Sequence, residues 1–417
     1  MIGPNPHGLA GMITLLGWIC FGILLPLSLL AIYQWILAIV SILPWPRRTP
    51  VPRGKLARFL ILIPAHNEES GISQTLESLA QLRYPQQLVR TIVIADRCND
   101  ATAANAGRYG VHCLERFTGP AGKGAAIAWG IDQMRRNSTA FDAVVILDAD
   151  TLADPRLLEA FNDGLLSGHE IQQGYNYLSN PWQTLFTRII AVTSVLRNGF
   201  FYSGKSRIGF SAMLTGTGMC FSRQVVERHG WTAFSVGEDW EFSVSLLLSG
   251  ERIFFNAMAR VFARESENFK QASTQRLRWA SGRYAVATNG AKKLFIKGIC
   301  LRRPYLLDAA ITLIAPNYST QATLAILGLF GAWFLSADPV WHFVLAWAVV
   351  VTGMFGAYFL LGVWFTEAPL RTLMGMTLIP VFLPWRIAIE ALGLFGFGRK
   401  RWVRTSRTTV SRSGTDQ

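Results

Sequence analysis

The chain has 417 residues, of which 51% are hydrophobic and 16% charged, and its formal net charge is +14. This composition excludes an ordinary soluble protein and a pure bundle of membrane helices, and it predicts a soluble domain fused to membrane segments. The five cysteines are scattered and have neither metal-ligand spacing nor a disulfide pattern, which fits a reducing cytosolic domain. A nucleic-acid-binding protein is disfavoured because the positive charge lies beside apolar segments.

Residues 1–46 are predicted to contain an N-terminal transmembrane helix. The run Leu9–Leu43 has no charged residue and is longer than the about 20 residues that span a bilayer. Basic residues follow it, in Arg47–Arg58, but none precedes it, so the positive-inside rule predicts an outside N-terminus and a cytosolic domain. Pro26 leaves a tight hairpin as the alternative to one span. A signal peptide is disfavoured because the segment before the run carries no positive charge.

The C-terminal third is predicted to return to the membrane. Residues 284–316 combine lysines and arginines with apolar side chains, which is typical of interfacial helices. Residues 317–365 are predicted to form two transmembrane helices. Residues 366–417 are interpreted as a re-entrant or interfacial segment with a basic cytosolic tail, because a full crossing would place that tail outside. The alternative for all these stretches is a set of buried core helices. We expect a multi-pass protein of a bacterial inner membrane, with the lipid bilayer as a partner.

Residues 55–283 show a different pattern, in which short apolar runs alternate with amphipathic stretches. The expected strands are Phe59–Ile63, Thr91–Ala95, Val111–Leu114 and Ala143–Leu147, and the expected helices are Ser70–Leu82, Ala101–Tyr109 and Lys123–Met134. This order predicts an α/β fold with a mostly parallel sheet covered by helices. Ligands of such sheets bind at the carboxyl ends of the strands.

Polar and acidic loops follow three of these strands. Their candidate residues are Pro64, Asn67, Glu68, Asp96, Asp148 and Asp150. Because the carboxyl ends of parallel strands meet at one sheet edge, we expect the carboxylates to share one crevice. Asp148 and Asp150 can hold Mg²⁺ or Mn²⁺, which would neutralise a diphosphate. For any single acidic loop, helix capping is the alternative.

Two glycine-containing stretches extend this set. The first ends at Lys123 at the start of a predicted helix, where backbone amides and one ammonium can meet a phosphate, although the P-loop spacing is absent. A plain turn explains it equally well. The second contains Gly216, Thr217 and Gly218, where the backbone can approach a ligand closely.

Two motifs close the central segment. Glu238 and Asp239 open an amphipathic helix, for which capping is the alternative. The second motif, which can clamp a diphosphate and stack a sugar ring, comprises Gln275, Arg276, Arg278 and Trp279. A juxtamembrane basic cluster would explain its arginines but not its glutamine and tryptophan.

Five motifs, in the order ILIPAHNEE, IADRCND, LDADT, GEDWE and QRLRW, resemble those of the family 2 inverting glycosyltransferases. More narrowly, they resemble the membrane-embedded branch that includes cellulose, hyaluronan, chitin-oligosaccharide and poly-N-acetylglucosamine synthases and ceramide glucosyltransferases. The resemblance covers about residues 59–283 and the arrangement of apolar segments. It implies a GT-A fold, the nucleotide-diphospho-sugar-binding α/β domain of this family.

The resemblance also implies residue roles. The implied donor-binding residues are Pro64, Asn67, Glu68, Asp96, Lys123, Asp148 and Arg278. Asp148 and Asp150 would hold the metal, Mg²⁺ or Mn²⁺, with Asp150 the more direct ligand. Asp239 would be the general base, with Glu238 beside it. The residues implied to contact the acceptor or the diphosphate are Gln275, Arg276, Trp279, Gly216, Thr217 and Gly218. The family's Thr-Glu-Asp triplet reads Gly237-Glu238-Asp239 here, which puts the acceptor contacts in doubt.

The implied function is metal-dependent, inverting transfer of a sugar from a nucleotide-sugar donor, with a UDP-sugar favoured, in polysaccharide synthesis. The alternative is addition of one sugar to a lipid, so the acceptor is a glycan or a lipid. A non-catalytic nucleotide-sugar-binding scaffold is a remote alternative. Three spans are few for a polysaccharide channel, so that function would call for an oligomer or for tightly associated interfacial helices.

Overall fold

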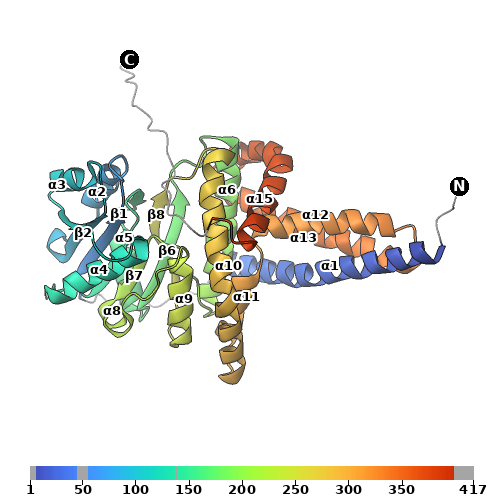
Figure 1. The fold of residues 1–417 in the computed structure, drawn as a ribbon, viewed down its shortest axis with the longest axis horizontal. Helices are drawn as coiled ribbons and strands as arrows, with labels where there is room; N and C mark the ends of the chain where they lie inside the picture. The colour runs from blue at the N-terminus through green and yellow to red at the C-terminus, as the bar shows by residue number, and fades with distance from the viewer. Residues whose placement is uncertain (1–5, 45–54, 138, 399–417) are drawn as a thin grey trace, which may run out of the picture.

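The computed structural model describes residues 6–44, 55–137 and 139–398 (Figure 1). Much of the basic cluster after the first apolar run and the basic tail beyond residue 398 lie outside the described residues. The fold has two parts, a sheet domain and an elongated group of apolar helices that leaves it on one side (Figure 1).

One eight-stranded sheet organises the first part. Its strands are β1 (Phe59–Ala65), β2 (Val89–Asp96), β3 (His112–Arg116), β4 (Ala143–Ile146), β5 (Thr151–Ala153), β6 (Ile171–Leu178), β7 (Met219–Ser222) and β8 (Phe254–Ala263), in the order β3-β2-β1-β4-β7-β6-β8-β5. The half built from β3, β2, β1 and β4 is parallel, as the sequence predicts. The other half is mixed, because β7 pairs antiparallel with both β4 and β6.

Helices cover both faces of this sheet. They are α2 (Ile72–Ala80), η1 (Gln86–Leu88), α3 (Thr102–Arg108), α4 (Lys123–Arg136), α5 (Leu157–Leu166), α6 (Leu185–Ser194), the π-helix η2 (Val195–Tyr202), α7 (Ser203–Arg207), α8 (Arg223–His229) and α9 (Glu238–Leu248). Strand β1 explains why the sheet needs two covered faces. Its Leu60 and Leu62 enter one hydrophobic core, whereas Phe59, Ile61 and Ile63 enter the other. An uninterrupted apolar run is the sequence signature of such a doubly covered strand.

The remaining helices form the second part of the molecule. They are α1 (Pro6–Ile42), α10 (Phe269–Cys300), α11 (Pro304–Ile314), α12 (Tyr318–Leu335), η3 (Pro339–Trp341), α13 (His342–Trp364), α14 (Pro369–Leu373), η4 (Met374–Leu378) and α15 (Ile379–Leu394). Helices α1, α12 and α13 pack side by side, and α10 runs across their ends at the sheet domain (Figure 1). We call the group α1, α12 and α13 the three-helix bundle.

Four segments of the described chain are long and apolar enough to cross a membrane. They are Gly11–Ile42, Tyr318–Leu335, Pro339–Trp364 and Pro369–Leu394. The first three correspond to the predicted spans. The fourth is the segment for which the sequence favours a re-entrant or interfacial position, and it is broken into α14, η4 and α15. Helix α15 lies against α10, since Trp385 donates a hydrogen bond to Ser273 at 2.9 Å. By length and composition the segment could also cross a membrane, so its non-crossing position stays a prediction.

Helix α10 differs from expectation in one respect. The sequence predicts that the Gln275–Trp279 motif precedes an interfacial helix. The structure places the motif inside α10, which continues without a break to Cys300. Asn268 caps its start by accepting a hydrogen bond from the Gln271 amide. One rigid element therefore connects the motif to the base of the three-helix bundle.

Candidate active site

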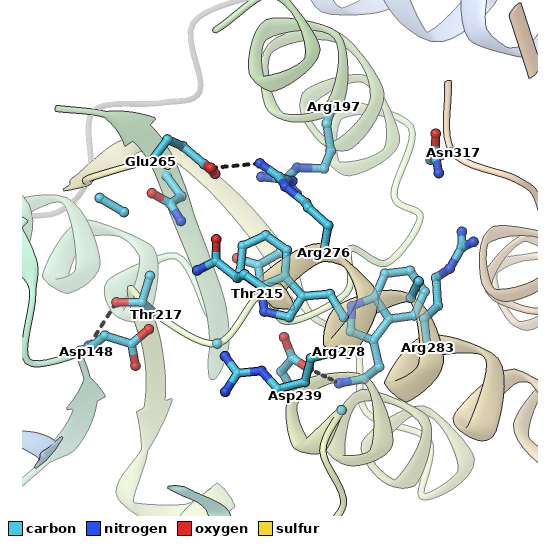
Figure 2. Close-up of a pocket in the computed structure, with 18 of the residues that line it drawn as sticks. Asp148, Arg197, Thr215, Thr217, Asp239, Glu265, Arg276, Arg278, Arg283 and Asn317 are labelled. Carbon is cyan, nitrogen blue, oxygen red and sulfur yellow. Dashed lines mark hydrogen bonds and ion pairs between the residues drawn. The ribbon is translucent and has the colours of Figure 1, made fainter. Parts of the chain in front are cut away.

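A cavity of about 930 Å³ lies between the sheet domain and the base of the three-helix bundle (Figure 2). All but two of the sequence-predicted site residues line it. Those that line it are Pro64, Glu68, Asp96, Lys123, Asp148, Asp150, Gly216, Thr217, Glu238, Asp239, Gln275, Arg276, Arg278 and Trp279. The structure thus brings the five motifs together. The exceptions are Asn67 and Gly218.

Asn67 shapes a loop beside the cavity. Its backbone has a φ of 55°, a left-handed conformation that asparagine tolerates better than most residues. Its side-chain oxygen accepts a hydrogen bond from the Asn99 amide at 2.9 Å. This contact joins the loop after β1 to the loop after β2, and it explains why asparagine is found here without a place on the cavity wall.

Asp96, at the end of β2, is almost fully buried and is held by two arginines. Its carboxylate pairs with Arg116 at 2.6 Å and with Arg97 at 3.0 Å. Sequence reasoning missed Arg116. The signal was its position at the end of β3, directly opposite Asp96 in the parallel register. Because a buried carboxylate needs compensation, these arginines fix Asp96 in its position on the cavity wall.

Lys123, the first residue of α4, connects three motifs. Its ammonium lies 2.5 Å from the Asp148 carboxylate and 3.7 Å from that of Glu238, and it donates a hydrogen bond to the Gly216 carbonyl at 2.7 Å. Burial opposes the charged ammonium, but the carboxylates of Asp148 and Glu238 outweigh it, and the pKa of Lys123 is raised. The lysine is therefore a permanent cation in the crevice.

The glycine loop is held by a buried residue that sequence reasoning missed, Gln173 of β6. Its amide nitrogen donates to the Thr217 carbonyl at 2.9 Å, and its amide oxygen accepts from the Thr215 amide at 2.8 Å. The Thr217 hydroxyl in turn accepts from the Asp148 amide at 3.0 Å (Figure 2). These bonds fix the glycine loop beside Asp148, the first residue of the Asp148–Asp150 pair. Nothing in the local sequence around Gln173 signals this role.

Asp239 and Glu238 form the first turn of α9, and their carboxylates face the cavity rather than bulk solvent. Burial, and then the neighbouring charge of Glu238, raise the pKa of Asp239 to about 7, despite the opposing effect of Lys123. Burial also raises the pKa of Glu238. A carboxylate that titrates near neutral pH can accept a proton during catalysis.

Helix α10 approaches α9 through two glycines. A Cβ added at Gly237 would lie only 3.1 Å from the backbone carbon of Gly282. This contact gives a physical reason for the glycine that replaces the threonine of the family triplet. It also places α10 close to Glu238 and Asp239, with Arg278 facing the same part of the cavity (Figure 2).

The guanidinium of Arg278 has no hydrogen bond or ion pair within the part of the chain that the structure describes. Burial lowers its pKa, and the charges of Glu238 and Asp148 oppose that shift. Its neighbour Arg276 is already occupied, since it pairs with Glu265 at 2.7 Å and stacks 4.8 Å from the ring centre of Trp279. Arg278 is thus the arginine of the motif that is best placed to receive an anion.

The residues present fit a divalent cation. Asp148 and Asp150 both line the cavity, and Mg²⁺ in nucleotide enzymes is commonly held by one or two carboxylates, substrate phosphates and water. The structure describes no cluster of three or more His, Cys, Asp or Glu residues able to hold a metal by itself. A cation here would therefore depend on ligands from a bound diphosphate. In the absence of a cation, the ammonium of Lys123 neutralises the Asp148 carboxylate.

The comparison with known families decides the class of protein. Residues 57–282, more than half of the chain, match the model described as Glycosyltransferase like family 2. The chain is a family 2 glycosyltransferase. This confirms the family and the enzyme class that the five motifs predict.

The fold of this glycosyltransferase is also confirmed. A solved structure, the mannosyltransferase PcManGT from Pyrobaculum calidifontis in complex with GDP-Man and Mn²⁺, superposes with a TM-score of 0.53 over 94% of this chain and 99% of that chain. The sequences are 14% identical, so the likeness concerns the fold alone. It agrees with the predicted GT-A fold.

Two curated relatives resemble the sheet domain of the glycosyltransferase. One is the probable glycosyltransferase YdaM of Bacillus subtilis strain 168, which is 27% identical over 249 residues, 58% of this chain and 59% of the relative. The other is a poly-beta-1,6-N-acetyl-D-glucosamine synthase of Staphylococcus aureus strain COL, 26% identical over 248 residues, 56% of each chain. The chain thus covers less than two thirds of the length of these relatives.

Proposed function

We propose that this glycosyltransferase transfers a sugar, with inversion, from a nucleotide-diphosphate sugar to an acceptor hydroxyl at the cytosolic face of a membrane. One observation carries the proposal. Asp239, a carboxylate with a pKa of about 7, shares a cavity with a lysine and an arginine whose charges suit a diphosphate. The resemblance favours a UDP-sugar. The apolar helices and the positive-inside rule support a multi-pass protein with a cytosolic catalytic domain.

The chemistry follows from these positions. Inverting transfer is one in-line displacement that needs a base for the acceptor hydroxyl and stabilisation of the leaving diphosphate. Asp239 accepts the proton of the hydroxyl. Arg278, which has no ion-pair partner among the described residues, binds the leaving diphosphate, and Lys123 adds a second positive charge. A cation held by Asp148 and Asp150 would supply charge neutralisation to the same diphosphate.

The test is a screen of nucleotide sugars for release of nucleoside diphosphate by the full-length enzyme with Mg²⁺ or Mn²⁺. We expect one donor class to be turned over and chelation of the metal to abolish the release. The variant Asp239→Asn should bind that donor as well as the wild type but lose transfer by at least about a hundredfold, since it removes the base.

Asp132→Asn is the matched control, because Asp132 is an exposed carboxylate on α4 that pairs with Arg136. It should keep full activity. If Asp239→Asn transfers sugar at the wild-type rate, Asp239 is not the base. Donor binding without turnover by the wild type would favour the non-catalytic scaffold.

Two acceptor classes that the sequence suggests are compatible with this function, a growing polysaccharide and a lipid. The synthase name of one relative supports the first. The packing of the three-helix bundle supports the second.

A further inference from the structure

The cavity extends from the catalytic crevice to the base of the three-helix bundle and ends there. From α1 it is lined by Leu30, Tyr33 and Gln34, from α12 by Tyr318, Ser319 and Gln321, and from α13 by Tyr358. All of these lie at the helix ends nearest the sheet domain. Gln34 donates a hydrogen bond to Gln321 at 2.7 Å, and this buried contact joins α1 to α12 at the inner end of the cavity.

Beyond that contact the bundle is filled by apolar side chains. Its buried core comprises Cys20, Leu24, Leu27, Ala31, Ala325, Ala332, Leu335, Trp341, Val344, Ala348, Val351 and Phe355. In the described part of these helices, the buried polar side chains are Gln34, Ser319, Thr320 and Gln321, all next to the cavity. A sugar polymer passing through the bundle would need polar partners along its whole length. The described helices of one chain therefore offer no such path, which favours a lipid acceptor over a polymer.

The wall of the cavity nearest the bundle carries an excess of positive charge. Four arginines line it, namely Arg197 of η2, Arg276 and Arg283 of α10 and Arg386 of α15. The carboxylates that pair with them are Glu265, 2.7 Å from Arg276, and Glu390, 2.7 Å from Arg283 and 2.9 Å from Arg386. Four arginines face two glutamates, which leaves two positive charges without a carboxylate of their own, one of them on the exposed residue Arg197. An anion is the natural complement of such a site.

Further unsatisfied groups point to the same chemistry. Arg197 has no carboxylate partner in the described chain, and Figure 2 shows it projecting into the cavity from η2. The Nε of Arg276 and the Nδ2 of Asn317, both from residues that line the cavity, are buried donors without an acceptor among the described residues. A phosphate offers several acceptor oxygens as well as negative charge.

These positions have an order. Gly282 contacts Gly237, so Arg283, the next residue, lies beside the Glu238–Asp239 end of the crevice. Arg283 also donates a hydrogen bond to the Ala315 carbonyl at 3.1 Å, just before α12 begins. The catalytic carboxylate, the arginines and the apolar helices thus follow one another along the cavity.

We propose that the acceptor is a membrane lipid with an anionic phosphate between its apolar tail and the hydroxyl that receives the sugar. This inference rests on the proposed function and specifies its acceptor. The acceptor oxygen bonds to the anomeric carbon, and the bond from that carbon to the donor diphosphate breaks. The hydroxyl proton passes to Asp239, and the nucleoside diphosphate leaves with the bonding electrons.

The acceptor site can be tested without any donor. The probe is phosphatidylglycerol with a fluorescent acyl chain, bound to the full-length detergent-solubilised enzyme and followed by fluorescence polarisation. Three competitors separate the parts of the ligand: phosphatidylglycerol has hydroxyl, phosphate and tail, diacylglycerol lacks the phosphate, and glycerol 3-phosphate lacks the tail. We expect only phosphatidylglycerol to displace the probe efficiently, with the other two at least about tenfold weaker.

The variant Arg197→Gln removes one charge without leaving a carboxylate unpaired, so it should fold normally. It should weaken probe binding about tenfold, the effect expected of one charge-assisted hydrogen bond. Arg371→Gln is the matched control, an exposed arginine of α14 that does not line the cavity, and it should bind like the wild type.

Equal binding by Arg197→Gln and the wild type would overturn the proposal. If diacylglycerol competes as well as phosphatidylglycerol, the phosphate does not contribute to binding, and the proposal is overturned. If glycerol 3-phosphate competes as well, the arginines bind a soluble phosphate rather than a lipid, and the proposal is likewise overturned. The binding assay contains no nucleotide sugar, so its result does not depend on the donor screen. The lipid acceptor can therefore be disproved while the proposed sugar transfer stands, and the reverse also holds.

Discussion

At the scale of single residues, Asp239 connects the electrostatics of the crevice to a measurable pH dependence. Its pKa of about 7 arises from burial and from Glu238, and Lys123 holds it below the value that those two effects alone would give. Only the deprotonated carboxylate can accept the proton of the acceptor hydroxyl. The rate should therefore rise with pH through about 7 and level off above it.

Replacing Lys123 by Gln gives the corresponding prediction. Loss of the ammonium removes the effect that lowers the pKa of Asp239, so the rising limb of kcat/KM against pH should move to higher pH. The measurement is a pH profile of both enzymes with the same donor. An unchanged profile in the variant would show that Asp239 does not control this limb.

Individual site residues were predictable where they belong to a local motif. Asp148 follows an apolar run, so its place at the sheet edge could be expected from strand order, whereas Lys123 and Asp239 were assigned to the same site only through the family resemblance. Arg116, Gln173 and Arg197 could not be identified in the same way. Arg116 and Gln173 acquire their roles from contacts with segments distant in the sequence, such as Gln173 with the loop of Thr215 and Thr217. Arg197 acquires its role from a cavity that distant segments form around it.

At the scale of elements, the contact between α9 and α10 sets the position of Arg278 relative to Asp239. The two helices meet at Gly237 and Gly282, where an added Cβ has no free space. We predict that Gly237→Ala displaces α10 by a few tenths of an ångström and lowers turnover about tenfold or more, because catalysis depends steeply on such positions. The measurement is the rate of nucleoside diphosphate release.

The control for this change is Gly107→Ala on α3, where an added Cβ would meet nothing within 4 Å. It should leave turnover unchanged. If Gly237→Ala is as active as this control, the close approach of the two helices is not required for activity.

Strands β1 to β4 and the helices between them were predictable because each apolar run is short and is followed by polar residues. The antiparallel half of the sheet was not predictable in this way, since β7 is only four residues long and its pairing with β4 is decided by distant contacts. The continuity of α10 was also missed. Its mixture of basic and apolar residues resembles an interfacial helix, whereas its first turns form a wall of the active site.

At the scale of the whole molecule, a buried ion pair joins the sheet domain to the apolar helices. Lys205 of α7 is fully buried and lies 2.7 Å from the Asp308 carboxylate of α11, and it donates a hydrogen bond to Thr312 at 2.9 Å. Tyr33 of α1 donates to the same carboxylate. Three elements from separate parts of the chain therefore meet at Asp308.

We predict that Lys205→Met lowers the free energy of unfolding by about 3–5 kcal/mol, because it leaves a buried carboxylate without its cation. The double variant Lys205→Met, Asp308→Leu should recover most of this loss, since the uncompensated charge is gone. Thermal unfolding of the detergent-solubilised proteins measures both. A double variant less stable than Lys205→Met would show that the polar contacts of Asp308 outweigh the cost of its unpaired charge.

The apolar filling of the three-helix bundle has a consequence for the cell as well as for the acceptor. A hydrated tunnel wide enough for a sugar chain would also conduct protons and small ions down the membrane potential. Leu24, Leu335 and Val344 belong to the buried apolar core of the bundle, which leaves no continuous row of buried water-binding groups for such a leak among the described residues. An enzyme built this way would not dissipate the gradient of an energised membrane, and under the proposed lipid acceptor its glycolipid would stay in the leaflet where it was made. Carrying such a product to the opposite leaflet would then require a separate flippase.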